Sequence, residues 1–168
     1  MIKLKVQDGV DTPRYQTKLA SGFDLQAISI HSVYKGAAPI PPDRLKDVQK
    51  NFIDKGFINM RPAERITFKT GVVLADIDSD FEIEIRSRSG MATKKGIFVS
   101  NQPGTIDADY RGELLVSLYN STTFLNAVVK DSRIAQAVVK KIERPKLVIT
   151  EEVKETDRGE DGFGSTGE

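Results

Sequence analysis

The sequence predicts an all-β fold, a sandwich or barrel built from short strands. Short runs rich in β-branched and aromatic residues recur along the chain, and Gly, Pro and Asn stand between them. Several runs alternate strictly between apolar and polar residues, while long helical periodicity is nearly absent. At 168 residues the chain has the size of one domain that can bury a core of its own.

The strands are expected in the following order. Ile2 to Val6 alternates apolar residues with lysines, which is typical of a half-buried strand. Further strand-like runs are Phe23 to Ile30, Arg65 to Ile77, Phe81 to Arg86, Ile97 to Val99, Leu114 to Tyr119, Ala127 to Val129, Ile134 to Ile142 and Lys146 to Val153. Thr70-Gly71 predicts a turn that divides the second of these runs into two strands. Pro103-Gly104 predicts another turn, so we expect a hairpin over residues 101–112.

One segment departs from the strand pattern. A proline pair at positions 41 and 42 is a helix-start signal, and Leu45, Val48 and Phe52 then fall on one helical face. Gly56 ends the pattern, so one inserted helix is expected from about Asp43 to Lys55, on the outside of the sandwich. The helix is either a contact for a protein partner or a cap on an open end of the sheet, and we favour the cap.

Composition excludes several classes of protein. Lys and Arg number 25 against 24 Asp and Glu, so bulk charge does not predict a nucleic-acid or membrane surface. The absence of cysteine excludes a disulfide scaffold, thiol catalysis and cysteine metal sites. No signal-peptide core and no apolar run of bilayer length is present. We expect a cytoplasmic protein without a nucleic-acid or membrane partner.

The composition changes after Ile149, where a charged stretch is followed by a glycine-rich end. We therefore expect residues 1–149 to form the β domain, with an insertion over about 31–62, and residues 150–168 to form a flexible C-terminal arm. The arm combines a cation at Arg158, an aromatic ring at Phe163, hydroxyls and glycine amides. Such groups can wrap a phosphate chain and cover a flat ring.

Five short stretches now look connected: Ala20 to Leu25, Arg88 to Ala92, Asn101 to Gly112, Arg133 to Gln136 and Arg158 to Gly167. In this order they resemble the five motifs of the homotrimeric deoxyuridine triphosphatase (dUTPase) family. Each motif alone is weak evidence, whereas five in order are specific. The resemblance implies hydrolysis of dUTP to dUMP and pyrophosphate, which lowers dUTP and supplies dUMP for thymidylate synthesis. It also implies a distorted jelly-roll β-sandwich of short antiparallel strands and a homotrimer with sites shared between three subunits.

The resemblance gives the third motif two roles. Asp107 is expected to be the base that activates a water for in-line attack on the α-phosphorus. Tyr110 is expected to pack beneath the deoxyribose, where a 2′-hydroxyl would clash with its ring. Asn101 and the backbone around Gly104 and Ile106 are expected to read the uracil edge.

The second and fourth motifs are expected to hold the phosphates. By resemblance, Arg88, Ser89 and Gly90 supply a guanidinium, a hydroxyl and a backbone amide to phosphate oxygens. Gln136 is expected to hold the α-phosphate or the attacking water. Arg133 is expected to make a structural ion pair within the trimer.

The first and fifth motifs complete the expected site. The family implies Mg²⁺ clamped by the three phosphates, with Asp24 holding one of the waters around the ion. In the arm, Phe163 is expected to cover the uracil as a lid. Arg158 and a cluster of arm residues are expected to grip the γ-phosphate. That cluster is Gly164, Ser165 and Thr166.

Two alternatives stay open. The dCTP deaminases of the same superfamily need a glutamate on the strand after the third motif, and the matching position here is Ser117. A module that binds a nucleotide or a regulatory protein without catalysis is the other alternative. Intact Asp107 and Tyr110 count against it, because a pure binder has no use for the base.

Overall fold

Twelve strands and two helices make up the described part of the chain, residues 1–160, in this computed structural model. The strands are β1 (Ile2–Val6), β2 (Phe23–Gln26), β3 (Ser29–Lys35), β4 (Ala38–Pro39), β5 (Phe57–Met60), β6 (Glu64–Ile77), β7 (Phe81–Ser87), β8 (Ile97–Val99), β9 (Gly104–Ile106), β10 (Glu113–Asn120), β11 (Asn126–Val129) and β12 (Arg133–Lys141). The helices are α1 (Pro42–Lys55) and α2 (Ser89–Lys95). The predicted all-β class is confirmed, whereas the expectation of a single helix is wrong because α2 is a second one.

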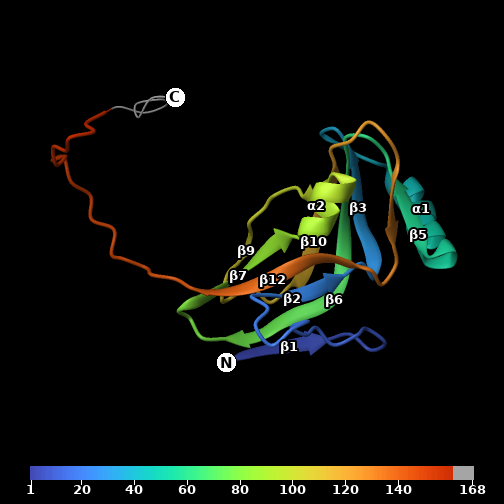
Figure 1. The fold of residues 1–168 in the computed structure, drawn as a ribbon, viewed down its shortest axis with the longest axis horizontal. Coiled ribbons are helices and arrows are strands. Elements are labelled where there is room, and N and C mark those ends of the chain that lie inside the picture. The colour runs from blue at the N-terminus through green and yellow to red at the C-terminus, as the bar shows by residue number, and fades with distance from the viewer. Residues whose placement is uncertain (161–168) are drawn as a thin grey trace.

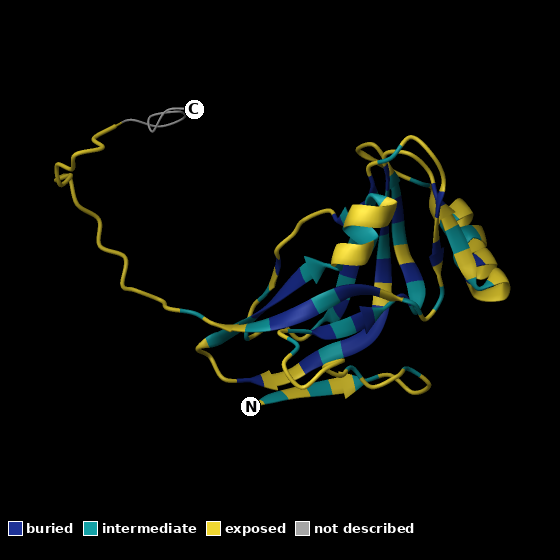
Figure 2. Cartoon of the chain, in the orientation of Figure 1, coloured by how far each residue is buried: buried dark blue, intermediate teal, exposed yellow. Residues whose placement is uncertain are grey.

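The strands form three antiparallel sheets (Figure 1). The larger sheet runs β4-β3-β6-β10-β8, with β1 also on β6, and a second sheet runs β2-β12-β7-β9. A two-stranded sheet of β5 and β11 lies near α1. Burial alternates along the central strands, as in β10, so one face of each large sheet lies in the common core. Figure 2 shows these buried positions on the strands, while α2 and the chain after β12 are largely exposed.

β6 is one continuous strand through the predicted turn at Thr70-Gly71, so that turn is wrong. Gly71 adopts a left-handed φ of 67°, which glycine takes without strain. Its N–H donates to the Glu113 carboxylate at 2.7 Å, and its carbonyl accepts the Gln7 N–H at 2.8 Å. Before Gly71 the strand pairs with β3 and β10, and beyond it the strand pairs mainly with β1. The glycine therefore marks a change of partner strand.

The chain crosses between sheets where continuous local structure was expected. The run from Phe23 to Ile30 is two strands, because the Ala27 N–H donates to Ser132 and the Ile28 N–H donates to Lys69 on the other sheet. Likewise, residues 101–112 do not form a hairpin. β9 pairs with β7, whereas β10 pairs with β6 and β8, so the connection between β9 and β10 links the two large sheets.

The predicted inserted helix is confirmed as α1, which begins one residue earlier, at Pro42. Gly56 ends it in a left-handed conformation, and its N–H donates to the Phe52 carbonyl at 3.0 Å. Phe52 is buried against Phe68 of β6, with ring centroids 5.7 Å apart. Among residues 1–160, no helix is long and apolar enough to cross a membrane.

The chain after β12 leaves the sheets in an extended path (Figure 1). Residues 142–160 contain no strand, so the strand predicted over Lys146 to Val153 is wrong. The apolar side chains of this segment lack a partner sheet and are exposed; they are Leu147, Val148, Ile149 and Val153.

Candidate active site

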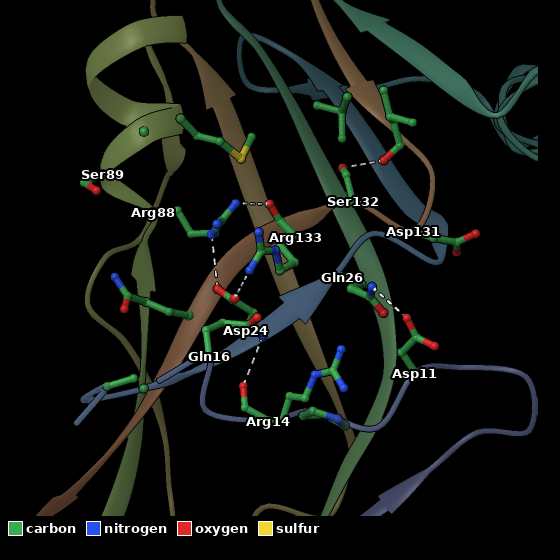
Figure 3. A pocket seen from close by; sticks show the side chains of 18 of the residues that line it. Asp11, Arg14, Gln16, Asp24, Gln26, Arg88, Ser89, Asp131, Ser132 and Arg133 are labelled. Atoms are coloured by element: carbon green, nitrogen blue, oxygen red, sulfur yellow. Dashed lines mark hydrogen bonds and ion pairs between the residues drawn. The ribbon is translucent and has the colours of Figure 1, made fainter. Parts of the chain in front are cut away.

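A polar cavity of about 890 Å³ lies beside β2, the start of α2 and β12 (Figure 3). Candidate residues from three separate motifs line it, namely Asp24, Arg88, Ser89, Gly90 and Gln136. The segment that follows β1 and the turn before β12 complete its walls. Folding therefore gathers the first, second and fourth motifs into one site.

Strand alternation points Asp24 and Gln136 into this cavity. Phe23 and Leu25 are buried in the core, so Asp24 lies on the opposite face of β2. Gln136 pairs with Asp24 across the β2–β12 ladder. The Gln136 side-chain N–H₂ donates to the Ser87 carbonyl at 3.1 Å, which ties it to β7. The two polar side chains thus lie side by side on a fixed sheet.

The Asp24 carboxylate joins two arginines. Its Oδ1 lies 3.1 Å from Arg88 Nε, and its Oδ2 lies 3.1 Å from Arg133 Nη1. Arg88 Nη1 also donates to the Arg133 carbonyl at 2.9 Å. The Asp24 side chain is only 13% exposed, and a carboxylate this buried is costly unless it is paired and hydrogen-bonded. The three residues therefore form one unit, visible in Figure 3, that fixes the Arg88 guanidinium at the cavity wall.

Ser89 and Gly90 begin α2, directly after the extended Arg88. Backbone N–H groups in the first turn of a helix have no carbonyl partner within that helix and carry partial positive charge. A Cβ at Gly90 would meet nothing within 4 Å. Packing of the chain itself therefore does not require a glycine at this position, and the space beside its amide is open to a ligand.

A second group of candidate residues lies just before β9, on β9 and in the connection to β10. The group comprises Asn101, Gly104, Ile106, Asp107 and Tyr110. None of these five residues lines the cavity that holds Asp24 and Arg88. Within one chain the two groups do not share this cavity, although Gln136 also lines a smaller pocket with Gln102 and Pro103 of the third motif.

Backbone contacts orient the second group. The Tyr110 N–H donates to the Asp107 carbonyl at 3.1 Å, and the Tyr110 hydroxyl donates to the Glu113 carbonyl at 3.1 Å. The Tyr110 ring is 40% exposed, and the Asp107 side chain is exposed and makes no ion pair with residues 1–160. The Asn101 side chain lies over Gly104, since a Cβ there would sit 3.1 Å from Asn101 Nδ2. A tyrosine held by its hydroxyl and an exposed carboxylate thus lie three residues apart on one turn.

A family model described as dUTPase matches residues 57–167, about two thirds of the chain. The chain belongs to the dUTPase family. It is 40% identical over 155 residues to the deoxyuridine 5'-triphosphate nucleotidohydrolase of Nautilia profundicola, and the match covers 92% of this chain and 89% of that protein. The family predicted from the five motifs is confirmed.

Solved dUTPase structures share the fold. The dUTPase of Staphylococcus bacteriophage 80alpha with dUPNHPP superposes with a TM-score of 0.74 at 22% identity, covering 99% of this chain and 98% of that one. A mutant dUTPase from phage phi11 of S. aureus, described with a structural Mg(II) ion, gives a TM-score of 0.66 at 17% identity and covers 92% of this chain and 99% of that one. The sheets described above are thus those of a dUTPase.

The described part of the arm, residues 150–160, supplies no residue to the lining of the cavity. Arg158 lies in the extended segment after β12, away from the cavity-lining residues. Phe163, Gly164, Ser165 and Thr166 lie outside the described residues, so their expected roles stay predictions. Arg133 forms an ion pair with Asp24 of the same chain, and a contact of Arg133 within a trimer stays a prediction.

Other cavity residues escaped the sequence analysis. Residues 11–14 and Gln16 line the cavity, and Gln26 donates to Asp11 at 3.4 Å. Polar residues around Pro13 indicate only a loop, and nothing in its sequence ties it to β2.

Lys95 also lines the cavity because it ends α2. Gly96 after two lysines is a helix-end signal that could have revealed this short helix.

The carboxylates at the cavity do not form a metal cage of their own. Within residues 1–160, no group of three or more His, Cys, Asp or Glu side chains could hold a metal ion. Mg²⁺ dehydrates reluctantly and is often bound by substrate phosphates, several waters and only one or two carboxylates. Asp24, held between two cations at the cavity wall, suits a water-mediated contact of that kind.

Proposed function

We propose that this chain hydrolyses dUTP to dUMP and pyrophosphate. The observation that carries the proposal is the gathering of Arg88, the Ser89 and Gly90 amides and Gln136 in one polar cavity of a dUTPase-family chain. A triphosphate is strongly anionic, and guanidinium groups and helix-start amides bind phosphate oxygens with charge-assisted hydrogen bonds. The curated relative named above is a deoxyuridine 5'-triphosphate nucleotidohydrolase, which supports the same substrate here.

The proposed reaction is an in-line displacement at the α-phosphorus. A water oxygen forms the new bond to phosphorus, its proton passes to the Asp107 carboxylate, and the bond from the α-phosphorus to the bridging oxygen breaks. The electron pair of that bond leaves with pyrophosphate. Arg88 stabilises the charge that grows on the phosphate oxygens, and Gln136 holds the α-phosphate or the attacking water. Asp107 is suited to this role because it is exposed and free of ion pairs within residues 1–160.

Selection of deoxyuridine is assigned to the second group of residues. The Tyr110 ring, oriented by its hydrogen bond to Glu113, would lie beneath the deoxyribose and exclude a 2′-hydroxyl. Asn101 and the backbone of Gly104 and Ile106 would match the uracil edge and leave unpaired polar groups against cytosine. The position of β9 at the edge of its sheet supports this role, because within residues 1–160 it pairs with β7 on one side and with no strand on the other.

A complete site is proposed to need a homotrimer. Asp107 and Tyr110 do not line the cavity that holds Arg88 and Gln136 in the same chain, which supports their action on the substrate of a neighbouring subunit. The arm of a third subunit would supply Arg158 and Phe163 above the nucleotide, with the hydroxyls and amides of residues 164–166 on the γ-phosphate. A cytoplasmic location and the absence of nucleic-acid and membrane partners stay predictions.

Mg²⁺ is proposed as the cofactor. When bound to the three phosphates of the substrate, it would neutralise their charge and fix the conformation of the triphosphate. Asp24 would hold one of its waters, while Arg88 and Arg133 keep the carboxylate oriented. The structural Mg(II) ion described for the phage phi11 dUTPase supports the presence of this metal in the family but concerns that protein.

Deamination of dCTP is not supported. The position that would need a glutamate is Ser117, whose hydroxyl accepts a hydrogen bond from the Ser100 hydroxyl at 3.0 Å. A serine there cannot replace a carboxylate as a proton carrier. A purely binding module is equally disfavoured, because it would not need the exposed Asp107 carboxylate, which makes no ion pair within residues 1–160.

The deciding experiment is a pyrophosphate-release assay with Mg²⁺ and four separate substrates, dUTP, dCTP, dTTP and UTP. Rapid release from dUTP and little from the other three nucleotides is expected. Ammonia released from dCTP would assign the chain to the deaminases, and absence of turnover with all four would leave a binding module.

A further inference from the structure

A second groove, of about 320 Å³, lies between α1, β3 and β5. Within residues 1–160 it shares no lining residue with the cavity of the candidate active site. Its floor is apolar, formed by buried Val33 and Phe52 with half-buried Ile58. Phe57 adds an aromatic wall that is 42% exposed. The inserted helix therefore does more than cover core residues, because it creates a concave apolar surface of its own.

Four cations surround this floor: Lys35, Arg44, Lys55 and Arg61. No side-chain hydrogen bond or ion pair engages any of the four within the part of the chain that the structure describes. The described lining contains one carboxylate, Glu64, which is buried and accepts the Arg61 backbone N–H at 2.9 Å. Four cations and one carboxylate leave a net charge of +3 in a chain whose total is +1. Positive charge is thus concentrated at this groove and left uncompensated.

The groove is also preformed. Gly56 joins α1 directly to β5, and its carbonyl accepts the Lys130 N–H at 2.8 Å. Phe52 anchors the helix on Phe68, and β5 is paired along its length with β11. A surface already held in its binding geometry loses little conformational freedom when a ligand binds.

We propose that this groove binds a short acidic segment of a partner protein. One large apolar side chain of the segment occupies the floor against Phe52 and Phe57, and neighbouring carboxylates pair with the rim cations. A volume of about 320 Å³ suits such an anchor with its flanking backbone, and the apolar floor supplies a hydrophobic contact that a bare anion would not use. A nucleic-acid strand would need a track of cations along its backbone, whereas these four surround one small concavity.

The test is an unbiased selection of displayed random 12-residue peptides on the full-length protein. Enriched peptides are expected to combine several acidic residues with one large apolar residue. Their affinity is expected to fall roughly tenfold or more for each of Arg44→Glu and Arg61→Glu, since a hydrogen bond to a charged group contributes that much. Lys46→Glu is the matched control, because it makes the same charge change on α1 outside the groove and should leave binding unchanged.

Several outcomes would overturn the proposal. The first is a selection that enriches no peptide, and the second is enrichment of peptides without acidic residues. The third is peptide binding that stays intact in Arg44→Glu and Arg61→Glu, once circular dichroism has shown that both variants are folded. A single-stranded oligonucleotide that binds the protein more tightly than the selected peptides would assign the groove to nucleic acid. A synthetic peptide copying residues 147–156 is included because that segment is itself acidic and apolar. If it binds more tightly than every selected peptide, the groove serves a second copy of this chain instead.

Discussion

Arg88 is held in place by Asp24 before any substrate is present. Its Nε lies 3.1 Å from Asp24 Oδ1, and a second hydrogen bond, from Nη1 to the Arg133 carbonyl, fixes the plane of the guanidinium. Arg133 in turn occupies the other carboxylate oxygen. An arginine that is already oriented loses little rotamer entropy on binding phosphate. Asp24 thus has a positioning role beyond any contact with a metal-bound water.

Asp24→Asn should lower kcat/KM for dUTP by about 10- to 100-fold, the usual cost of losing a partner that orients a functional group. The neutral amide can no longer offset two guanidinium charges, so Arg88 becomes mobile. Steady-state kinetics with Mg²⁺ in excess measure the effect. Asp11→Asn is the control, because Asp11 lines the same cavity and its one side-chain hydrogen bond within residues 1–160 comes from Gln26, at 3.4 Å. Equal kinetics for both variants would contradict the positioning role.

Local sequence patterns predicted α1 and most of the longer strands, but they missed β4 and β5 and could not show which strands pair. Gly71 illustrates the limit, because a glycine in a left-handed conformation suits a turn or a change of partner strand equally well. α2 escaped prediction since its seven residues include no buried side chain and so show no hydrophobic periodicity. The motifs identified Asp24 and Arg88 individually. Only the register of β2, β12 and β7 reveals that one carboxylate serves both Arg88 and Arg133.

Asp107→Asn should reduce kcat for dUTP by about 10²- to 10⁴-fold, the contribution of a positioned general base. The isosteric amide cannot accept the water proton, yet it preserves the shape of the β9–β10 connection. Binding of a non-hydrolysable dUTP analogue, measured by titration calorimetry, should change little. Asp109→Asn is the control and should retain turnover, because Asp109 has no assigned role. Near-normal turnover of Asp107→Asn would show that another group is the base.

Two inactive variants should restore activity when they are mixed. Arg88→Ala removes the phosphate contact and Asp107→Asn removes the base, and in a shared-site trimer some sites combine an intact Arg88 with an intact Asp107. Refolding equal amounts together should recover about a quarter of the wild-type sites if chains assort at random in a cyclic trimer. Each variant refolded alone is the control. If the mixture stays as inactive as its components, both residues act within one chain.

Glu84 should make folding stability fall in acid. Hydrogen bonds lower the pKa of this buried carboxyl below its usual range. The larger effect comes from Lys140, at 2.9 Å, and the smaller from Arg86. The folded state therefore binds fewer protons, so the stabilisation is complete above the unfolded pKa and is lost as pH falls through the folded pKa. Glu84→Gln should cost roughly 1.5–3 kcal/mol at pH 7, since it removes hydrogen bonds to a charged group. Urea unfolding at fixed protein concentration should show this difference shrinking as the pH falls below about 4.

Glu82→Gln is the matched control, because Glu82 lies on the same strand and makes no ion pair with residues 1–160. A difference between wild type and Glu84→Gln that stays constant from pH 7 to pH 3 would show that packing, not the ionised carboxylate, supplies the stability.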